Sequence, residues 1–208
     1  MEKIRLLNSK NAYAKKFKTL TGLESHFADV LGEPEAYGIW IVYGKEKHGK
    51  TLCSLMLANA LSNLTKVVYI SAEEGISQHF QDTMSRLNID ANNPRLFFSE
   101  YISIDELRVI LGRRNAPKVV FVDNVTAMIH ELRQDAARKL SQDFPNVLFV
   151  YVAHQEKNEP YTAIAKKIKI WAKAIFRVEG LRVMVSGRVP GGEYNLHEAK
   201  AWLYHGQN

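Results

Sequence analysis

The chain has 208 residues, 46% hydrophobic and 24% charged, which is typical of a globular domain large enough to bury a full core. Cys53 is the only cysteine, so a disulfide framework is excluded and a reducing cytoplasm is the expected location. We expect no signal peptide and no membrane span, because no apolar run has the required length. The formal net charge of +6 favours an anionic partner without identifying one.

The predicted elements begin with a basic arm over residues 1–18, in which Lys15, Lys16 and Lys18 surround Phe17. A single domain is expected over residues 19–208. Its first element is a short helix that begins near Leu23 and ends within residues 28–34.

Apolar strand-like runs then alternate with segments of helical spacing. Strand-like runs occupy residues 39–43, 66–70, 96–98, 119–122 and 147–153, and helices are predicted over residues 51–61, 78–87, 105–111, 136–142 and 165–174. Ser103 or Asp105 is expected near the cap of the helix over 105–111. Two last strands, over 174–178 and 182–186, should pair around Glu179 and Gly180, and the tail that follows should pack on the core. This order predicts an α/β fold with a mostly parallel central sheet flanked by helices and antiparallel strands at its C-terminal edge.

The segment YGKEKHGKTL, residues 43–52, lies between a predicted strand and a predicted helix. It fits G-x-x-x-x-G-K-[ST], a loop whose glycines let several backbone N–H groups face an anion at the start of a helix. Lys50 is expected to reach the terminal phosphates of ATP, and the Thr51 hydroxyl to hold Mg²⁺. The predicted nucleotide-binding residues are Gly44, Lys45, Glu46, Lys47, His48, Gly49, Lys50, Thr51 and Leu52.

Two carboxylates follow predicted strands that should lie beside this loop. Asp123 ends VVFVD, where it can orient the shell of a bound Mg²⁺; alternatively it only starts the turn DNVT. Glu73 follows KVVYIS and can polarise an attacking water, although the adjacent Glu74 could take that role and either carboxylate could be merely solvated.

Four segments together resemble the RecA-type ATPase cores, including the RadA and DnaB-like relatives. They are GLESHFADVLGEPEAYGIWIVYGKEKHGKT, YISAEEG, VVFVDNVTA and FVYVAHQ, in the order and spacing of that family. The resemblance implies a RecA-like P-loop fold from about residue 22 to residue 193. It also implies Mg²⁺-dependent ATP hydrolysis, with Glu73 as general base, Asp123 acting through Mg²⁺, and Gln155 sensing the γ-phosphate unless it only caps its strand.

The resemblance also implies a homo-oligomer, a ring or a filament, with the nucleotide at the subunit interface. Lys173, Arg177 and Arg188 are candidates for a finger that reaches a neighbour's nucleotide, and Arg188 is the best placed because it leaves a strand into a glycine-rich turn. Family members often have Lys-x-Arg at this point, whereas this chain has SGR at residues 186–188. The alternative is a solvated hairpin arginine.

The segment after Gln155 contacts DNA in RecA-type proteins, and single-stranded DNA is the favoured partner here. The candidate contacts are Lys157, Lys166, Lys167, Lys169 and Lys173, with Tyr161 and Trp171 able to stack on bases. The alternative is an amphipathic helix with Ala165, Ile168, Trp171, Ala172 and Ile175 facing inward and lysines that are only solvated.

Three functions remain open from the sequence. The first is a DNA-dependent ATPase in recombination, repair or replication, and the chain's single-domain size suggests a bacteriophage or mobile-element source. The second is a ring-forming helicase or motor component. The third is a non-enzymatic module switched by ATP, which Glu73 disfavours because a switch needs no water-activating carboxylate.

Overall fold

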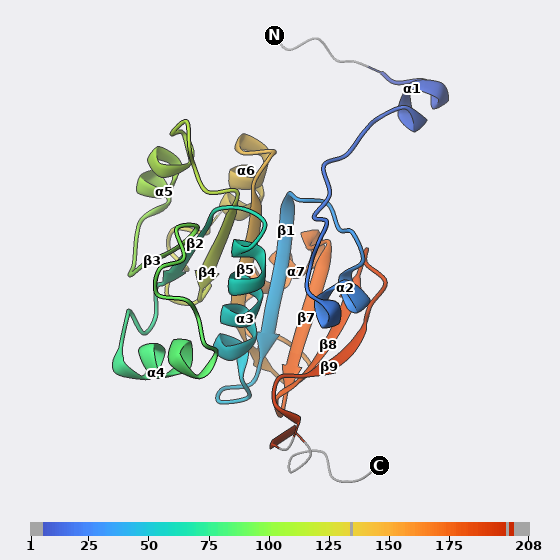
Figure 1. The fold of residues 1–208 in the computed structure, drawn as a ribbon. Helices are drawn as coiled ribbons and strands as arrows, with labels where there is room; N and C mark the ends of the chain where they lie inside the picture. Colours follow the sequence, from blue (N-terminus) through green and yellow to red (C-terminus); the bar gives the residue numbers. More distant parts are fainter. Residues whose placement is uncertain (1–5, 134, 199, 202–208) are drawn as a thin grey trace.

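The computed structural model describes residues 6–133, 135–198 and 200–201. A nine-stranded sheet forms its centre, in the order β3-β2-β4-β5-β1-β7-β8-β9, with β6 paired to β5 (Figure 1). The parallel strands are β1 (Gly38–Gly44), β2 (Val67–Ser71), β3 (Leu96–Ser99), β4 (Val119–Asp123), β5 (Leu148–Glu156) and β7 (Ala174–Glu179). The antiparallel strands are β6 (Glu159–Pro160), β8 (Arg182–Gly187) and β9 (Gly192–Asn195).

Helices cover both faces of the sheet. The described helices are α1 (Ser9–Tyr13), α2 (Ser25–Leu31), α3 (Lys50–Ser62), α4 (Gln78–Arg86), α5 (Ile104–Leu111), α6 (Ala136–Asp143) and α7 (Ala163–Trp171). One apolar cluster joins α2, α3 and α4 to one face, and a second joins α5, α6 and α7 to the other. The central strands are buried on both faces, which explains why they are apolar throughout.

The predicted α/β fold, with its parallel centre and antiparallel C-terminal edge, is therefore confirmed. The helix expected over residues 165–174 is the main boundary error. It ends at Trp171, because Ala172 is extended and the Lys173 amide donates to the Ile39 carbonyl at the start of the sheet. Ile175 thus lies in β7 rather than on the inner face of a helix.

The antiparallel edge extends further than the sequence indicates. The strand β9 falls in the tail that was expected to pack on the core, and Tyr194 of β9 lies against Phe27 of α2. The tail's Trp202 and Tyr204 lie outside the described residues. In the described part of the chain, no helix has the length and apolar character needed to cross a membrane.

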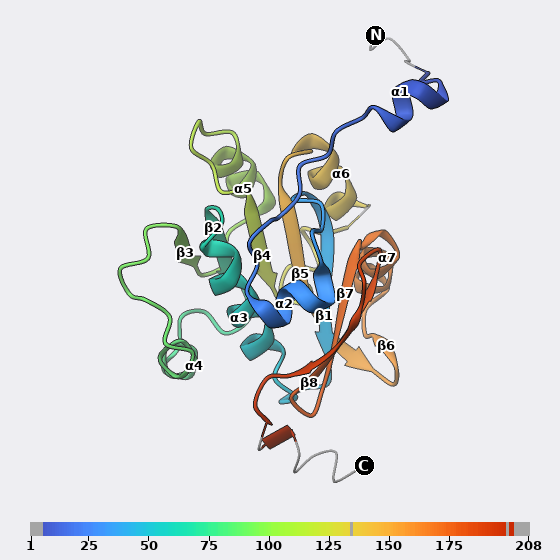
Figure 2. The same ribbon diagram turned by 45° about the vertical axis from the view of Figure 1, so that its right-hand side comes forward.

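The basic arm leaves the layered body of the molecule. Figures 1 and 2 both show α1 standing away from the sheet and its helices. The chain joins the body at Thr19, which bridges to Glu35, and at the buried Leu20.

Candidate nucleotide-binding site

The predicted phosphate-binding sequence forms the loop between β1 and α3, at the carboxyl end of the parallel strands (Figure 1). Both of its glycines are required by the geometry. A side chain on Gly44 would collide with the carbonyl oxygen of Val178 on β7, and Gly49 has a φ of 100°, in the left-handed region. Gly49 directly precedes α3, so the helix begins where an anion in the loop would lie.

Lys50 is held inside the loop by its own neighbours. The residue is 8% exposed, and its Nζ donates a 2.9 Å hydrogen bond to the Lys45 carbonyl. Burial lowers the pKa of Lys50, while the negative charges of Asp123 and Glu73 oppose that shift. The ammonium group therefore lies in a pocket with nearby negative charge, and an entering phosphate would add to the stabilisation of its charged form.

Asp123 ends β4 in a buried position beside the loop. The Tyr69 hydroxyl of β2 donates a 2.6 Å hydrogen bond to its Oδ2, and Ser54 of α3 lies 2.7 Å from that hydroxyl. Burial raises the pKa of Asp123 to about 6, although the Tyr69 bond and Lys50 work in the opposite direction. The carboxyl group is thus placed where a cation would restore its ordinary ionisation.

Glu73, Asn124 and His154 form a cluster at the ends of three neighbouring strands. The Asn124 amide nitrogen donates to Glu73 Oε2 and lies 2.8 Å from His154 Nε2, which is 3.3 Å from Glu73 Oε1. The Asn124 Oδ1 accepts from the backbone amides of Thr126 and Ala127, which orients the Nδ2 group towards Glu73. Both Glu73 and Glu74 are exposed, but these contacts hold the carboxylate of Glu73, and Glu74 has no such contacts in the described structure.

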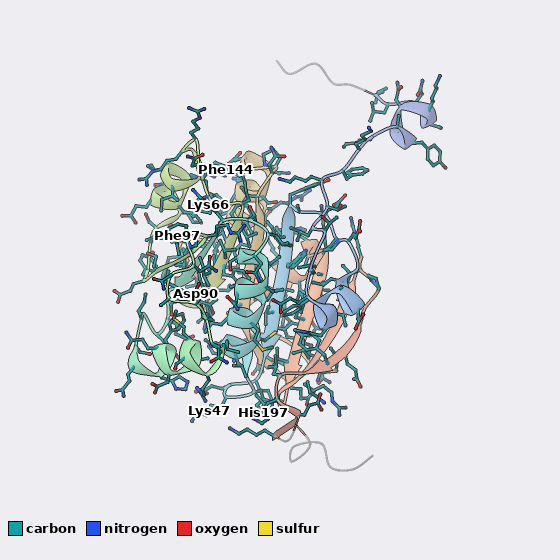
Figure 3. All side chains as sticks on the ribbon, in the orientation of Figure 1. Lys47, Lys66, Asp90, Phe97, Phe144 and His197 are labelled. Carbon is teal, nitrogen blue, oxygen red and sulfur yellow. The ribbon has the colours of Figure 1, made fainter. Side chains whose placement is uncertain are left out.

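One cavity of about 570 Å³ brings these groups together. Its lining residues include Lys50, Thr51, Glu73, Glu74, Asp123, Asn124 and His154. Its other wall is one face of α4, which contributes His79, Thr83 and Arg86 at helical spacing. The Arg86 guanidinium donates a 2.9 Å hydrogen bond to the Thr83 hydroxyl. Figure 3 shows Lys47, another lining residue, at the same end of the molecule.

Asn124, His154 and Arg86 were not selected as site residues from the sequence. Asn124 follows Asp123 and His154 precedes Gln155, so adjacency to two strand-end residues was the signal that could have found them. Gln155 lies at the same end of the sheet but does not line the cavity. Its amide donates to the Lys157 carbonyl, and its buried Oε1 has no hydrogen-bond partner among the described residues.

Arg188 and Lys173 lie at the opposite end of the sheet from their own phosphate loop. The Arg188 amide donates to the Lys173 carbonyl, and Lys173 precedes Ala174, which is in register with Trp40 of β1. Trp40 lies four positions before Gly44 in β1, which corresponds to about 13 Å of strand. Arg177 lies nearer the loop, but its guanidinium is bound to Glu179 at 2.8 Å and to Asn158 at 3.2 Å.

The five lysines after Gln155 are not one free cationic surface. Lys167 pairs with Asp135 at 3.0 Å, Lys169 pairs with Glu159 at 2.8 Å, and Lys173 pairs with Glu35. Lys157 and Lys166 are exposed and form no ion pair within the described residues. The helix α7 is amphipathic, with Ala165 and Ile168 buried, and Trp171 is half-buried beneath Arg138.

No family model and no curated protein matches the chain. Among solved structures, it is similar to the crystal structure of the flagellar accessory protein FlaH from Methanocaldococcus jannaschii, at 16% identity and a TM-score of 0.62. The match covers 86% of this chain and 92% of that chain. At this identity the likeness concerns the fold alone. Taken with the strand order and the phosphate loop, it shows that this chain has a RecA-like P-loop α/β fold.

Proposed function

We propose that the chain binds ATP with Mg²⁺ and hydrolyses it. The observation that carries this proposal is the convergence of Lys50, Thr51, Asp123 and Glu73 on one cavity at the carboxyl end of the sheet. Loop amides and the Lys50 ammonium would bind the phosphates, and α3 would add the positive end of its dipole.

The available ligands suit Mg²⁺. The Thr51 hydroxyl and the Asp123 carboxylate are hard oxygen donors, and Mg²⁺ in phosphate sites takes few protein ligands and fills the rest of its shell with phosphate oxygens and water. When bound, it would neutralise charge on the phosphates. The buried Asp123 carboxyl, with its raised pKa, is a group that a cation would favour in its ionised form.

Glu73 would act as general base. Its carboxylate extends from the end of β2 into the cavity, where it can take a proton from a water molecule that attacks the terminal phosphorus. Asn124 and His154 would hold this carboxylate in position. Gln155 would respond to the nucleotide state from the next strand, and Arg188 would complete the site of a neighbouring copy in a ring or filament.

The proposed nucleic-acid partner is single-stranded DNA, in recombination, repair or replication. Lys157 and Lys166 support it, because they are exposed cations within five residues of Tyr161 in the sequence, and Tyr161 is 55% exposed. A ring-forming helicase or motor would use the same residues, and an ATP-switched module would use the loop without hydrolysis. We further propose a cytoplasmic location and the domain limits 19–208, with residues 1–18 as an arm.

The experiment is ATP binding and turnover by the wild type and by Lys50→Ala, with and without single-stranded DNA. We expect Lys50→Ala to lose ATP binding or turnover while its circular dichroism stays unchanged. Unchanged ATP affinity in a folded Lys50→Ala variant would overturn the proposal. ATP binding without turnover in the wild type would favour the ATP-switched module. Turnover that DNA does not change would contradict the proposed DNA partner.

A further inference from the structure

The arm over residues 6–18 combines positive charge with exposed aromatic rings, and every one of these residues is exposed. Its cations are Lys10, Lys15, Lys16 and Lys18. This segment contains no acidic residue. Tyr13 is 92% exposed and Phe17 is 50% exposed, and the Lys15 ammonium lies 5.3 Å from the centre of the Phe17 ring. Cations and rings therefore alternate along one extended segment.

A second group of cations lies on the body of the molecule, at the amino ends of β2 and β4. The turn over residues 112–118 exposes Arg113, Arg114 and Lys118 and contains no acidic residue. The Lys118 amide donates a 2.9 Å hydrogen bond to the Lys66 carbonyl, and the Lys66 ammonium donates to the Asn115 carbonyl in the turn at 3.4 Å. Four cationic residues are thus gathered at this end of the sheet.

A polar recess joins the arm to this second group. Its volume is about 240 Å³, and both Lys18 of the arm and Lys118 of the turn line it. The other polar side chains of its lining are Thr19, Thr21, Thr65 and Asn146. Ammonium, hydroxyl and amide groups all donate hydrogen bonds to phosphate oxygens. The arm, the turn over 112–118 and Lys66 therefore form one continuous cationic surface, the amino-end surface.

The amino-end surface lies away from the candidate nucleotide cavity. Figure 3 shows Lys66 at one end of the molecule and Lys47 of the phosphate loop at the other, and Figures 1 and 2 show the arm at the end of Lys66. Within the structure as described, no lysine or arginine of this surface forms an ion pair. Asp143, a carboxylate that ends α6, is already bound to Arg108 at 2.7 Å. The charge of the surface is therefore available to an external anion.

We propose that the amino-end surface binds a single-stranded nucleic acid. Its lysines and arginines would contact successive phosphates, and Tyr13 and Phe17 would stack on bases. The rings favour a single strand over a duplex, because the faces of paired bases are already stacked on their neighbours. The hydroxyl and amide groups of the recess suit a phosphate chain better than the apolar layer of a membrane. This inference rests on the nucleic-acid partner of the proposed function, for which it assigns a further surface, and not on ATP hydrolysis.

Fluorescence anisotropy with a labelled oligothymidylate, over a salt series without ATP, tests the charges in the full chain. Lys15→Ala with Lys16→Ala, and Arg113→Ala with Arg114→Ala, should each weaken binding by about tenfold or more. Each pair should also reduce the slope of log affinity against log salt by about 2. The matched control, Lys139→Ala with Lys200→Ala, removes two exposed lysines elsewhere and should bind as the wild type does. All these positions are exposed, so circular dichroism should stay unchanged.

Tyr13→Ala with Phe17→Ala tests stacking separately from charge. Binding of oligothymidylate should weaken by about tenfold or more while the salt slope stays that of the wild type. Binding of a DNA duplex should change little in this variant. Unchanged affinity for oligothymidylate, or an equal loss for the strand and the duplex, would overturn the assignment of a single strand.

The remaining outcomes separate this surface from the lysines after Gln155 and from a membrane. If Lys157→Ala with Lys166→Ala abolishes binding while the arm and turn variants bind normally, the inference is overturned and the proposed DNA partner is retained. A wild type that binds no oligothymidylate overturns both, whereas ATP turnover, measured separately, still decides the hydrolysis. If the arm variant loses binding to phosphatidylserine vesicles but keeps its affinity for oligothymidylate, the surface belongs to a membrane contact and the inference is overturned.

Discussion

The Tyr69 hydroxyl donates a 2.6 Å hydrogen bond to the buried carboxyl group of Asp123, and this bond links β2 to β4 beneath the phosphate loop. Both side chains are enclosed, so the carboxyl group has lost most of its contact with water. One hydrogen bond does not compensate for that loss, and the pKa of Asp123 stays raised at about 6. The ligand-free protein therefore carries a carboxyl group that is costly to ionise.

This cost should appear in the pH dependence of stability. Because the folded-state pKa of about 6 lies above the ordinary 3.8, the contribution of Asp123 to stability is complete below pH 3.8 and is lost as the pH rises through 6. The loss is about 3 kcal/mol. Asp123→Asn should remove this decline. In urea unfolding without Mg²⁺, the free energy of unfolding of the variant should therefore rise relative to that of the wild type between pH 4 and pH 7. Exposed Asp105→Asn is the control, and a difference between Asp123→Asn and the wild type that is independent of pH would contradict the prediction.

A substitution of Glu73 should affect ATP turnover but not ATP affinity. Glu73→Gln keeps the size of the side chain but removes the base, so turnover should fall by about a hundredfold or more while ATP affinity is retained. Glu74→Gln is the matched control, because Glu74 lines the same cavity without the contacts that hold Glu73. Steady-state kinetics and equilibrium ATP binding measure the two effects. A loss in Glu74→Gln with none in Glu73→Gln would assign the base to the other carboxylate.

Asn124 and His154 should act through Glu73. Since both contact its carboxylate, Asn124→Ala and His154→Ala should lower kcat with little change in ATP affinity. His154→Gln, which can still donate or accept a hydrogen bond, should recover part of the lost kcat. The decisive measurement is the same set in a Glu73→Gln background, where the two alanine substitutions should have little further effect. Full additivity of the losses there would mean that these residues do not work through Glu73.

The main residues of this candidate site can be predicted from the sequence because they follow simple rules. Gly44, Gly49 and Lys50 belong to a local motif, and Asp123 and Glu73 stand where apolar strands end. The alternation of strands and helices predicts a parallel sheet whose carboxyl ends meet at one edge, but it does not predict the order that places β4 between β2 and β5. The clamp of Asn124 and His154 on Glu73 joins residues 30 to 81 positions apart, and no local pattern marks it.

The ion pairs of the lysines after Gln155 also could not be predicted from the sequence. Lys169 and Glu159 are ten residues apart on different elements, and Lys173 meets Glu35 from 138 residues away. A count of lysines after Gln155 could not show that three of the five carry partners. The end of α7 depended on a hydrogen bond from Lys173 to β1, which is likewise a tertiary contact.

Binding of single-stranded DNA, if it uses this segment, should depend on the two lysines without ion pairs. Lys157→Ala and Lys166→Ala should each weaken binding and reduce the slope of log affinity against log salt by about 1. Lys167→Ala should have a smaller effect, because Asp135 already compensates its charge. Fluorescence anisotropy over a salt series measures both quantities. Equal effects at all three positions would show that the ion pairs open when DNA binds, and no effect would place the DNA elsewhere.

Arg188 should act on the nucleotide of a neighbouring copy, because the length of the sheet separates it from its own phosphate loop. Arg188→Ala should therefore retain ATP binding and lose most turnover, and wild-type activity per molecule should rise with protein concentration. Mixing Arg188→Ala with Lys50→Ala should restore some turnover, since mixed assemblies pair an intact loop with an intact arginine. Arg182→Ala, at the other end of β8, is the control and should not be rescued in this way. If the mixture stays inactive and activity per molecule is independent of concentration, Arg188 only supports the turn after β8 and the site is complete within one chain.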